Sequence, residues 1–138
     1  MEKNSNEKII LELSTLVRHV TSTTYKTGCY LDRSGYLLLQ HIVTHGPTGV
    51  KALAEEFGLN VSTTSRQSAA LAQKGYVKRV PDPVDGRAFS LQITALGEKA
   101  LNHDRELRRT LIDEVFKDWT AQEREMFGEL LAKFNRAF

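Results

Sequence analysis

Hydrophobic side chains recur at intervals of three and four positions in the first third of the chain, and this spacing predicts amphipathic helices. The first helix covers about residues 6–25 and the second about residues 32–44. Asp32 stands where a capping side chain would begin the second helix. That helix is expected to end at Gly46-Pro47, because glycine terminates helices and proline cannot continue one.

Two shorter helical patterns follow, one over about residues 50–57 and one that runs to about residue 74. Gly58 separates them, and glycine adopts the positive φ of a tight turn at low cost. Asn60 or Ser62 caps the second of these helices. Two short helices joined by so tight a turn are typical of a helix-turn-helix.

The pattern then changes to alternation, which predicts strands over about residues 76–80 and 88–93. Between them lies a turn-rich segment with Asp85-Gly86, a strong signal for a hairpin. A long helix is expected over about residues 94–118, and a final helix begins at a capping box from Thr120 to Glu123. The expected fold is mostly α, a winged helix-turn-helix of six helices plus a β-hairpin wing.

Composition limits the class of protein without deciding its function. The chain has 138 residues, of which 41% are hydrophobic and 26% charged, as in one ordinary globular domain. No apolar run approaches the length of a membrane helix, and the first residues do not resemble a signal peptide, so we expect a cytoplasmic protein without membrane contact. The single cysteine, Cys29, excludes an internal disulfide and a cysteine-based metal cluster. We expect no metal and no cofactor.

The distribution of charge says more than the net charge of +2. Residues 57–81 contain no aspartate or glutamate, whereas Arg66, Lys74, Lys78 and Arg79 are basic. A locally positive segment in a nearly neutral chain is what a phosphate-facing surface needs. The alternative is a solvated face, which most short charge runs are.

Three adjacent features turn this segment into a candidate DNA-binding unit. Ala54 and Gly58 are small enough for two helices to cross at a tight turn. The next helix opens with six polar residues, whose hydroxyl, amide and guanidinium groups can reach phosphates and base edges in a major groove. Arg87 lies near the tip of the hairpin, where it could enter a minor groove. The residues expected to contact DNA are Thr48, Ser62, Thr63, Thr64, Ser65, Arg66, Gln67, Arg79 and Arg87.

Each feature has an ordinary alternative. The polar residues could form a solvent face, and Arg87 could pair locally with Asp82 or Asp85. A helix-turn-helix also occurs in modules that bind only proteins. The order and adjacency of the three features favour DNA.

Residues 31–101 resemble the MarR family of transcriptional regulators. The matching segments are residues 50–58, 62–66, 71–77, 82–87 and 91–97, of which Asp-Pro-Val-Asp-Gly-Arg in the wing is the most specific. The resemblance implies a homodimer that reads a pseudo-palindromic operator in double-stranded DNA, in most cases as a repressor. It also implies that Arg87 inserts from the wing, that Asp85 helps to orient it, and that a small ligand or an oxidant releases the DNA.

The apolar stripes of the first helix and the last two helices favour a dimer independently. A chain of this size built around a small winged unit has no second core that would bury them, although burial within the chain is the alternative. We therefore divide the chain into an N-terminal dimerisation helix (1–31), a DNA-binding region (32–93) and C-terminal dimerisation helices (94–138).

Candidate effector sites are weaker. A ligand pocket could be lined by His19, Tyr25, Tyr30 and Tyr36. Cys29 could sense oxidants, but a lone cysteine is more often a packing residue, and this one follows the first helix, whereas the reactive cysteine of peroxide-sensing relatives lies within it.

His41 and His45 have the spacing of a helical metal-binding pair, but histidine is also favoured near a helix C-terminus. An enzyme is not expected. The sequence has no phosphate-binding loop, no Gly-x-Ser-x-Gly and no Gly-x-Gly-x-x-Gly, and no spacing supports a nucleophile with its base.

Overall fold

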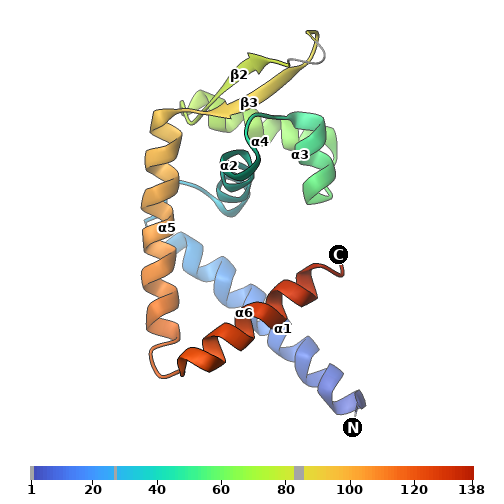
Figure 1. Cartoon of the computed structure of the whole chain (residues 1–138), viewed down its shortest axis with the longest axis vertical. Helices are drawn as coiled ribbons and strands as arrows, with labels where there is room; N and C mark the ends of the chain where they lie inside the picture. The colour runs from blue at the N-terminus through green and yellow to red at the C-terminus, as the bar shows by residue number, and fades with distance from the viewer. Residues whose placement is uncertain (1, 27, 83–85) are drawn as a thin grey trace. The chain divides into compact units, whose positions relative to one another are not determined.

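The computed structural model describes residues 2–26, 28–82 and 86–138, without the side chains of residues 2, 3 and 23–26. These residues form six helices and three strands, so the expected fold class is confirmed (Figure 1). In chain order they are α1 Glu2–Lys26, α2 Arg33–His45, β1 Thr48–Gly49, α3 Val50–Phe57, α4 Val61–Gln73, β2 Val77–Pro81, β3 Phe89–Ile93, α5 Ala95–Val115 and α6 Ala121–Asn135. Within the described residues, none of the helices has the length and apolarity that a bilayer span requires.

Local capping explains most helix boundaries. The Asp32 side chain accepts a hydrogen bond from the Gly35 amide at 2.7 Å and begins α2. Gly58 ends α3 in the left-handed region, with φ of 63°, as its position in the sequence predicts. At the start of α6, Thr120 and Glu123 form the expected capping box.

The sheet has one strand more than the predicted hairpin. Thr48 and Gly49 form the short strand β1, which pairs with Leu91 and Ser90, so that the strand order is β1-β3-β2. The sequence predicted the helix over residues 50–57 but no strand before it. A two-residue strand has no detectable alternation of its own, and its pairing partner lies more than 40 positions away in the chain.

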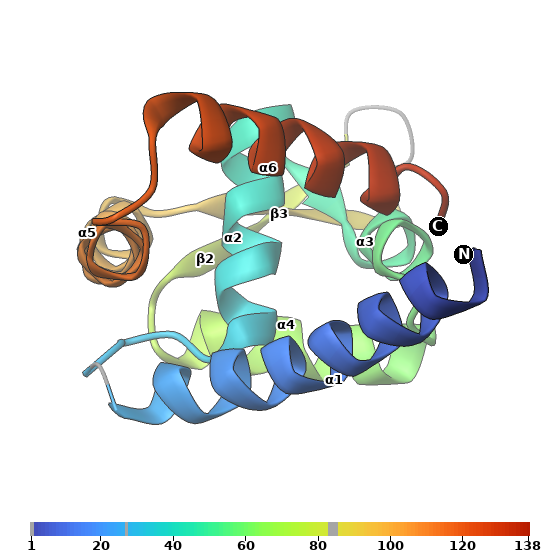
Figure 2. The same cartoon turned by 90° about the horizontal axis from the view of Figure 1, so that it is seen from below.

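The core of the winged region gathers side chains from α2, α3, α4, the sheet and α5. Figure 2 shows α2 running through this region with the sheet behind it. The buried apolar residues of this cluster are Leu31, Leu38, Leu39, Ile42, Leu53, Leu71, Val77, Leu91 and Leu101. The core therefore fixes α4 and the sheet, the two elements that carry the predicted DNA contacts, in one compact unit.

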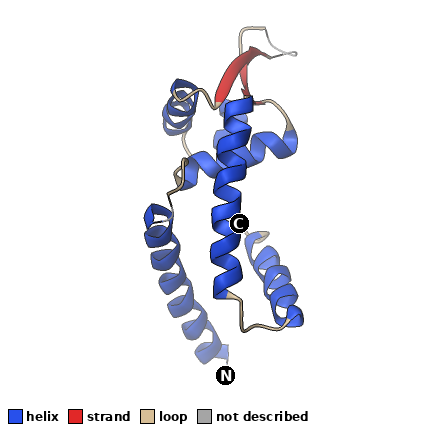
Figure 3. Ribbon diagram, turned by 90° about the vertical axis from the view of Figure 1, so that its left-hand side faces the viewer, coloured by secondary structure: helices blue, strands red, loops and turns tan. Residues whose placement is uncertain are grey.

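The junction between the sheet and α5 is tightly built. Thr94 caps α5 by accepting from the Gly97 amide at 3.0 Å, and its hydroxyl donates to the Gly75 carbonyl oxygen. A Cβ at Gly97 would collide with the carbonyl oxygen of Tyr76. Glycine is thus required where α5 passes the start of β2. Figure 3 shows the two long strands at the end where α5 begins.

The chain divides into two compact units, Met1–Arg105 and Glu106–Phe138, and α5 begins in the first and ends in the second. Within the second unit, the rings of Phe116, Trp119 and Phe127 pack at centroid distances of 4.5 to 5.8 Å. Arg124 donates to the carbonyl oxygen of Phe116 at 2.6 Å and closes the corner between α5 and α6. The sequence predicted that the long helix ends near residue 118. In the structure α5 ends at Val115, and residues 116–119 belong to this corner instead.

Candidate nucleic-acid interface

Helix α4 presents one continuous exposed stripe. The helix begins at Asn60, whose side chain accepts from the Thr63 amide at 2.8 Å. Spacings of three and four then bring seven exposed residues onto one face: Ser62, Ser65, Arg66, Ala69, Ala70, Gln73 and Lys74. The opposite face is anchored by Leu71 in the core. The stripe carries two cations, two hydroxyls, an amide and two small residues, a surface that can approach a groove closely.

Thr64 does not belong to this stripe. It is completely buried, and its hydroxyl donates to the Asn60 carbonyl oxygen at 3.1 Å. Ser68, one turn later, is also buried and donates to the Thr64 carbonyl oxygen at 2.7 Å. Local bonds to the preceding turn satisfy both hydroxyls inside the core. We therefore correct the sequence-based set by removing Thr64, since a buried side chain cannot reach DNA.

The other predicted residues of α4 differ in availability. Ser65 and Arg66 are exposed, and so is Ser62, although its hydroxyl donates to the Asn60 side chain at 2.9 Å. Thr63 and Gln67 are half-buried. The Oε1 atom of Gln67 is buried without a hydrogen-bond partner, beside a cavity of about 230 Å³ that Arg66 and Lys74 also line.

Three residues of the stripe were missed by sequence reasoning, namely Ala69, Ala70 and Gln73, and Lys74 was noted for its charge but not included in the predicted contact set. The signal was available, because the same periodicity that predicted the helix extends the exposed face from Ser62 to its C-terminal end. The predicted set instead followed polar residues that are consecutive in sequence, and neighbours along a helix point in different directions.

The strands carry the remaining predicted cations. Arg79 is exposed on β2, where it pairs with Leu91, and Arg87 is exposed just before β3. Thr48 is half-buried in β1, and its hydroxyl donates to the Gly46 carbonyl oxygen at 2.8 Å. Asp85, the expected partner of Arg87, lies outside the described residues. The structure thus brings Arg79 and Arg87 onto the hairpin and places Thr48 in β1, an edge strand of the sheet.

Of the predicted effector residues whose side chains are described, His19, Tyr30 and Tyr36, only Tyr30 lines a cavity of the loop after α1. A cavity of about 240 Å³ is lined by the loop from Gly28 to Arg33 and by Thr21 of α1. His19 lies on the exposed part of α1, and Tyr36 packs against the core. The side chain of Tyr25 is not among those described. Cys29 is half-buried and lines the same cavity.

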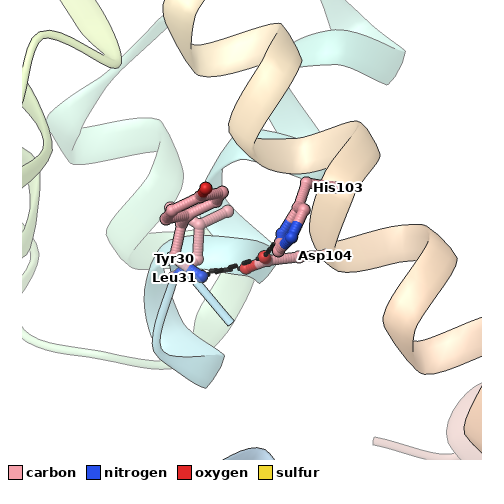
Figure 4. A network of polar contacts seen from close by, with 4 residues as sticks. All are labelled: Tyr30, Leu31, His103 and Asp104. Carbon is pink, nitrogen blue, oxygen red and sulfur yellow. Dashed lines mark hydrogen bonds and ion pairs between the residues drawn. The ribbon is translucent and has the colours of Figure 1, made fainter. Parts of the chain in front are cut away.

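A buried carboxylate holds this loop in place (Figure 4). Asp104 of α5 is completely buried and accepts hydrogen bonds from the amides of Tyr30 at 2.9 Å and Leu31 at 2.8 Å. The ring of His103 packs on the ring of Tyr30 at a centroid distance of 4.4 Å, and its Nδ1 lies 3.1 Å from the Asp104 carboxylate. Sequence reasoning missed Asp104, because an aspartate among the charged residues of a long helix looks solvated.

The histidine pair of α2 is stacked. The rings of His41 and His45 are 4.2 Å apart, and Nδ1 of His45 lies 3.1 Å from the His41 carbonyl oxygen. Among the described residues no group of three or more histidine, cysteine, aspartate or glutamate side chains is arranged to hold a metal ion. The pair therefore has no third protein ligand in this part of the chain.

Comparison with known proteins agrees with this geometry. The model of the MarR family matches residues 31–89. The HTH-type transcriptional regulator YxaD of Bacillus subtilis (strain 168) is 44% identical over 99% of this chain and 96% of its own length. Among solved structures, MarR has a TM-score of 0.80 at 22% identity, covering 91% of this chain and 86% of that chain. PcaV of Streptomyces coelicolor, solved in complex with its natural ligand, has a TM-score of 0.72 at 20% identity, covering 91% and 90%.

The identity with YxaD extends from the winged region through both terminal helices, and the family match covers the helix-turn-helix and the first part of the wing. The chain belongs to the MarR family and is a DNA-binding, HTH-type transcriptional regulator.

Proposed function

We propose that the chain acts as a homodimeric repressor that reads a pseudo-palindromic operator and is released by a small ligand. The observation that carries the proposal is the exposed stripe of α4 together with the cations of the hairpin in the same compact unit. Such a unit reads bases in a major groove with its helix and binds the backbone and minor groove with its wing. The proposal includes no catalytic step, and it places the protein in the cytoplasm with its DNA.

The contact residues divide by role. Ser62, Ser65 and Arg66 are exposed at the start of α4, where a recognition helix meets base edges. Thr63 and Gln67 flank them along α4. Thr48 lies in β1, where it pairs with Leu91 of the wing. Arg79 and Arg87 supply charge for phosphates or a minor groove. Lys74, at the far end of the stripe, is an additional phosphate contact.

The dimer is supported by apolar surface that one chain leaves exposed. In α1 this surface comprises Ile9, Ile10, Leu11, Leu16, Val17 and Val20. In the second unit it comprises Ile112, Val115, Trp119, Met126, Leu130, Phe134 and Phe138. Single exposed apolar residues need no explanation, but sets of six and seven on short segments are typical of an interface. A second copy of the chain is the partner that would give a symmetric reader of a palindrome.

Release by a ligand is supported by the cavity at the loop from Gly28 to Arg33. Arg33 donates to the Thr21 hydroxyl at 3.2 Å, and both residues line the cavity together with the apolar Leu31. The loop is bonded to α5 through Asp104, and α5 is anchored to the sheet at Gly97. A molecule in the cavity would therefore act on residues that are physically connected to the wing.

The decisive experiment is selection of genomic DNA fragments by the purified protein, followed by titration of the selected duplex at several salt concentrations. We expect a site with two related half-sites and a bound complex of two chains per duplex. Arg87→Ala should weaken binding about tenfold and reduce the salt slope by about one, because one cation–phosphate contact is lost. Arg66→Ala and Gln67→Ala should alter sequence preference more than the salt slope.

Unchanged affinity of Arg87→Ala at every salt concentration would reject the wing assignment. Selection of a site without internal symmetry, or binding of one chain per duplex, would reject the dimeric reading. If no compound in a chemical screen lowers the affinity for DNA, only the proposed release by a ligand is rejected.

A further inference from the structure

An aromatic side chain is exposed on the hairpin. Phe89, the first residue of β3, is 55% exposed, and it is the one aromatic residue among the large exposed hydrophobics of described residues 31–101. Burial of an exposed phenyl ring is favourable wherever a partner surface can cover it. Its position next to the wing loop makes it different from the aliphatic residues that are exposed on the helices.

The register shows which way this ring faces. Phe89 lies opposite Pro81, Leu91 lies opposite Arg79, and Ile93 lies opposite Val77. Directly paired residues, and residues two apart on a strand, share one face of a sheet. Val77 and Leu91 are buried on that face, in the core cluster that also contains Leu71 of α4.

The face therefore has a buried part and an exposed part. The buried part packs on the helices, while Arg79, Pro81 and Phe89 continue the same face beyond the core and are all exposed. This outer part lies on the helix side of the sheet, the side to which α4 belongs. When α4 occupies a major groove and the wing tip a minor groove, the sugar–phosphate ridge between the two grooves passes along this side.

We propose that Phe89 packs against the deoxyribose rings of that ridge, at the wall of the minor groove, with Pro81 beside it. This inference rests on the proposed wing contact. Deoxyribose offers the apolar C–H surface that an aromatic ring covers, and the two flanking arginines, Arg79 and Arg87, match the adjacent phosphates in charge. Phe89 is thus a positioning residue that determines how deeply the wing enters the minor groove.

The contact differs from the arginine contacts in one measurable respect. An arginine that neutralises a phosphate releases a counterion, so its contribution falls with increasing salt. Apolar packing on a sugar releases no counterion, so the contribution of Phe89 is the same at low and high salt. It also carries no base information, so its loss weakens binding to the operator and to unrelated duplexes alike.

The test uses Phe89→Thr, which removes the ring and introduces a β-branched residue suited to a strand. Phe89→Tyr retains the ring. The control is Leu96→Ala, because Leu96 is similarly exposed at 53% but follows the opposite end of β3. The probes are a labelled duplex of about 30 base pairs, selected by the wild-type protein from random sequences, and an unrelated duplex of equal length. Folding and oligomeric state are checked by circular dichroism and sedimentation.

We expect Phe89→Thr to lose about tenfold in affinity for both duplexes, with the wild-type salt slope. In the free protein about half of the Phe89 surface is in contact with water, and the DNA would cover this part. Phe89→Tyr and Leu96→Ala should bind as the wild type does. Wild-type affinity of Phe89→Thr, a reduced salt slope, or loss of affinity accompanied by dissociation of the oligomer would each overturn the inference. If Arg87→Ala weakens binding and Phe89→Thr does not, only this inference fails; if neither does, the wing contact itself is wrong.

Discussion

The winged region and the terminal helices use the same kind of local signals but differ in what surrounds them. From α2 to the first half of α5, every helix and both strands of the hairpin contribute side chains to one buried cluster. Helix α6 has no buried residue, and neither does the described part of α1. Both regions have helical periodicity and α6 has a complete capping box, so the difference lies in tertiary burial.

This contrast shows which apolar side chains are buried within one chain and which are left exposed. Caps and periodicity stabilise a helix by small amounts, and most helical stability comes from packing of the apolar face. The winged region obtains that packing from itself. The terminal helices require apolar surface from elsewhere, and the proposed dimer supplies it. Three pairs of substitutions can break or sharpen the distinction.

The largest effect is expected from a charge in the exposed apolar surface of the terminal helices. Leu130→Glu places a carboxylate where the proposed partner would bury a leucine, and symmetry makes the change act twice. The dimer dissociation constant should rise roughly 1,000-fold, while the winged region keeps its fold. Sedimentation velocity measures the first effect and circular dichroism the second.

Lys133→Glu is the matched control, since it puts the same carboxylate into α6 at an exposed polar position. It should leave the dimer intact. A Leu130→Glu protein that sediments like the wild type at every concentration would show that the apolar surface of α6 is not the interface.

The second prediction compares two glycines, one in each compact unit. Gly97→Ala should destabilise the protein by about 3 kcal/mol, because the new methyl group meets the Tyr76 carbonyl oxygen and backbone must move. Gly128→Ala in α6 should stabilise it by about 0.5–1 kcal/mol, because nothing lies within 4 Å of the new Cβ and alanine favours the helix. Urea denaturation measures both free energies of unfolding. Equal effects of the two substitutions would contradict the assignment of Gly97 to a close contact.

The third and smallest effect concerns the buried carboxylate of α5. Asp104→Ala leaves the amides of Tyr30 and Leu31 without their acceptor and should cost about 2 kcal/mol of unfolding free energy. Asp113→Ala on the same helix removes an exposed carboxylate and should change stability by less than about 0.5 kcal/mol. Thermal unfolding of both variants provides the comparison, and indistinguishable midpoints would mean that the loop does not depend on Asp104.

Sequence reasoning predicted the elements that depend on local chemistry. Asp32, Gly58 and the Thr120 capping box act within one turn of a helix, so their effect can be read from neighbouring residues. The alternation from residue 88 to 93 likewise predicted β3 to within one residue. The general position of the recognition helix and the wing followed from these elements.

Features that depend on distant residues were not predictable in the same way. Strand β1 exists because it pairs with Leu91, and Asp104 is buried because two loop amides point at it from 73 and 74 positions away. Thr64 is an intermediate case. Its hydroxyl suggested DNA, but the helical phase that it shares with Ser68 and Leu71 turns it into the core.

The bonds from Asp104 also provide a spectroscopic handle on the regulator. Amide protons that donate to a buried carboxylate exchange slowly with solvent, because the loop must open before water reaches them. The amides of Tyr30 and Leu31 should therefore be protected from hydrogen–deuterium exchange although Tyr30 itself is largely exposed. Two backbone resonances, observed in the absence of DNA and before any effector is identified, would report whether a compound has entered the cavity beside them.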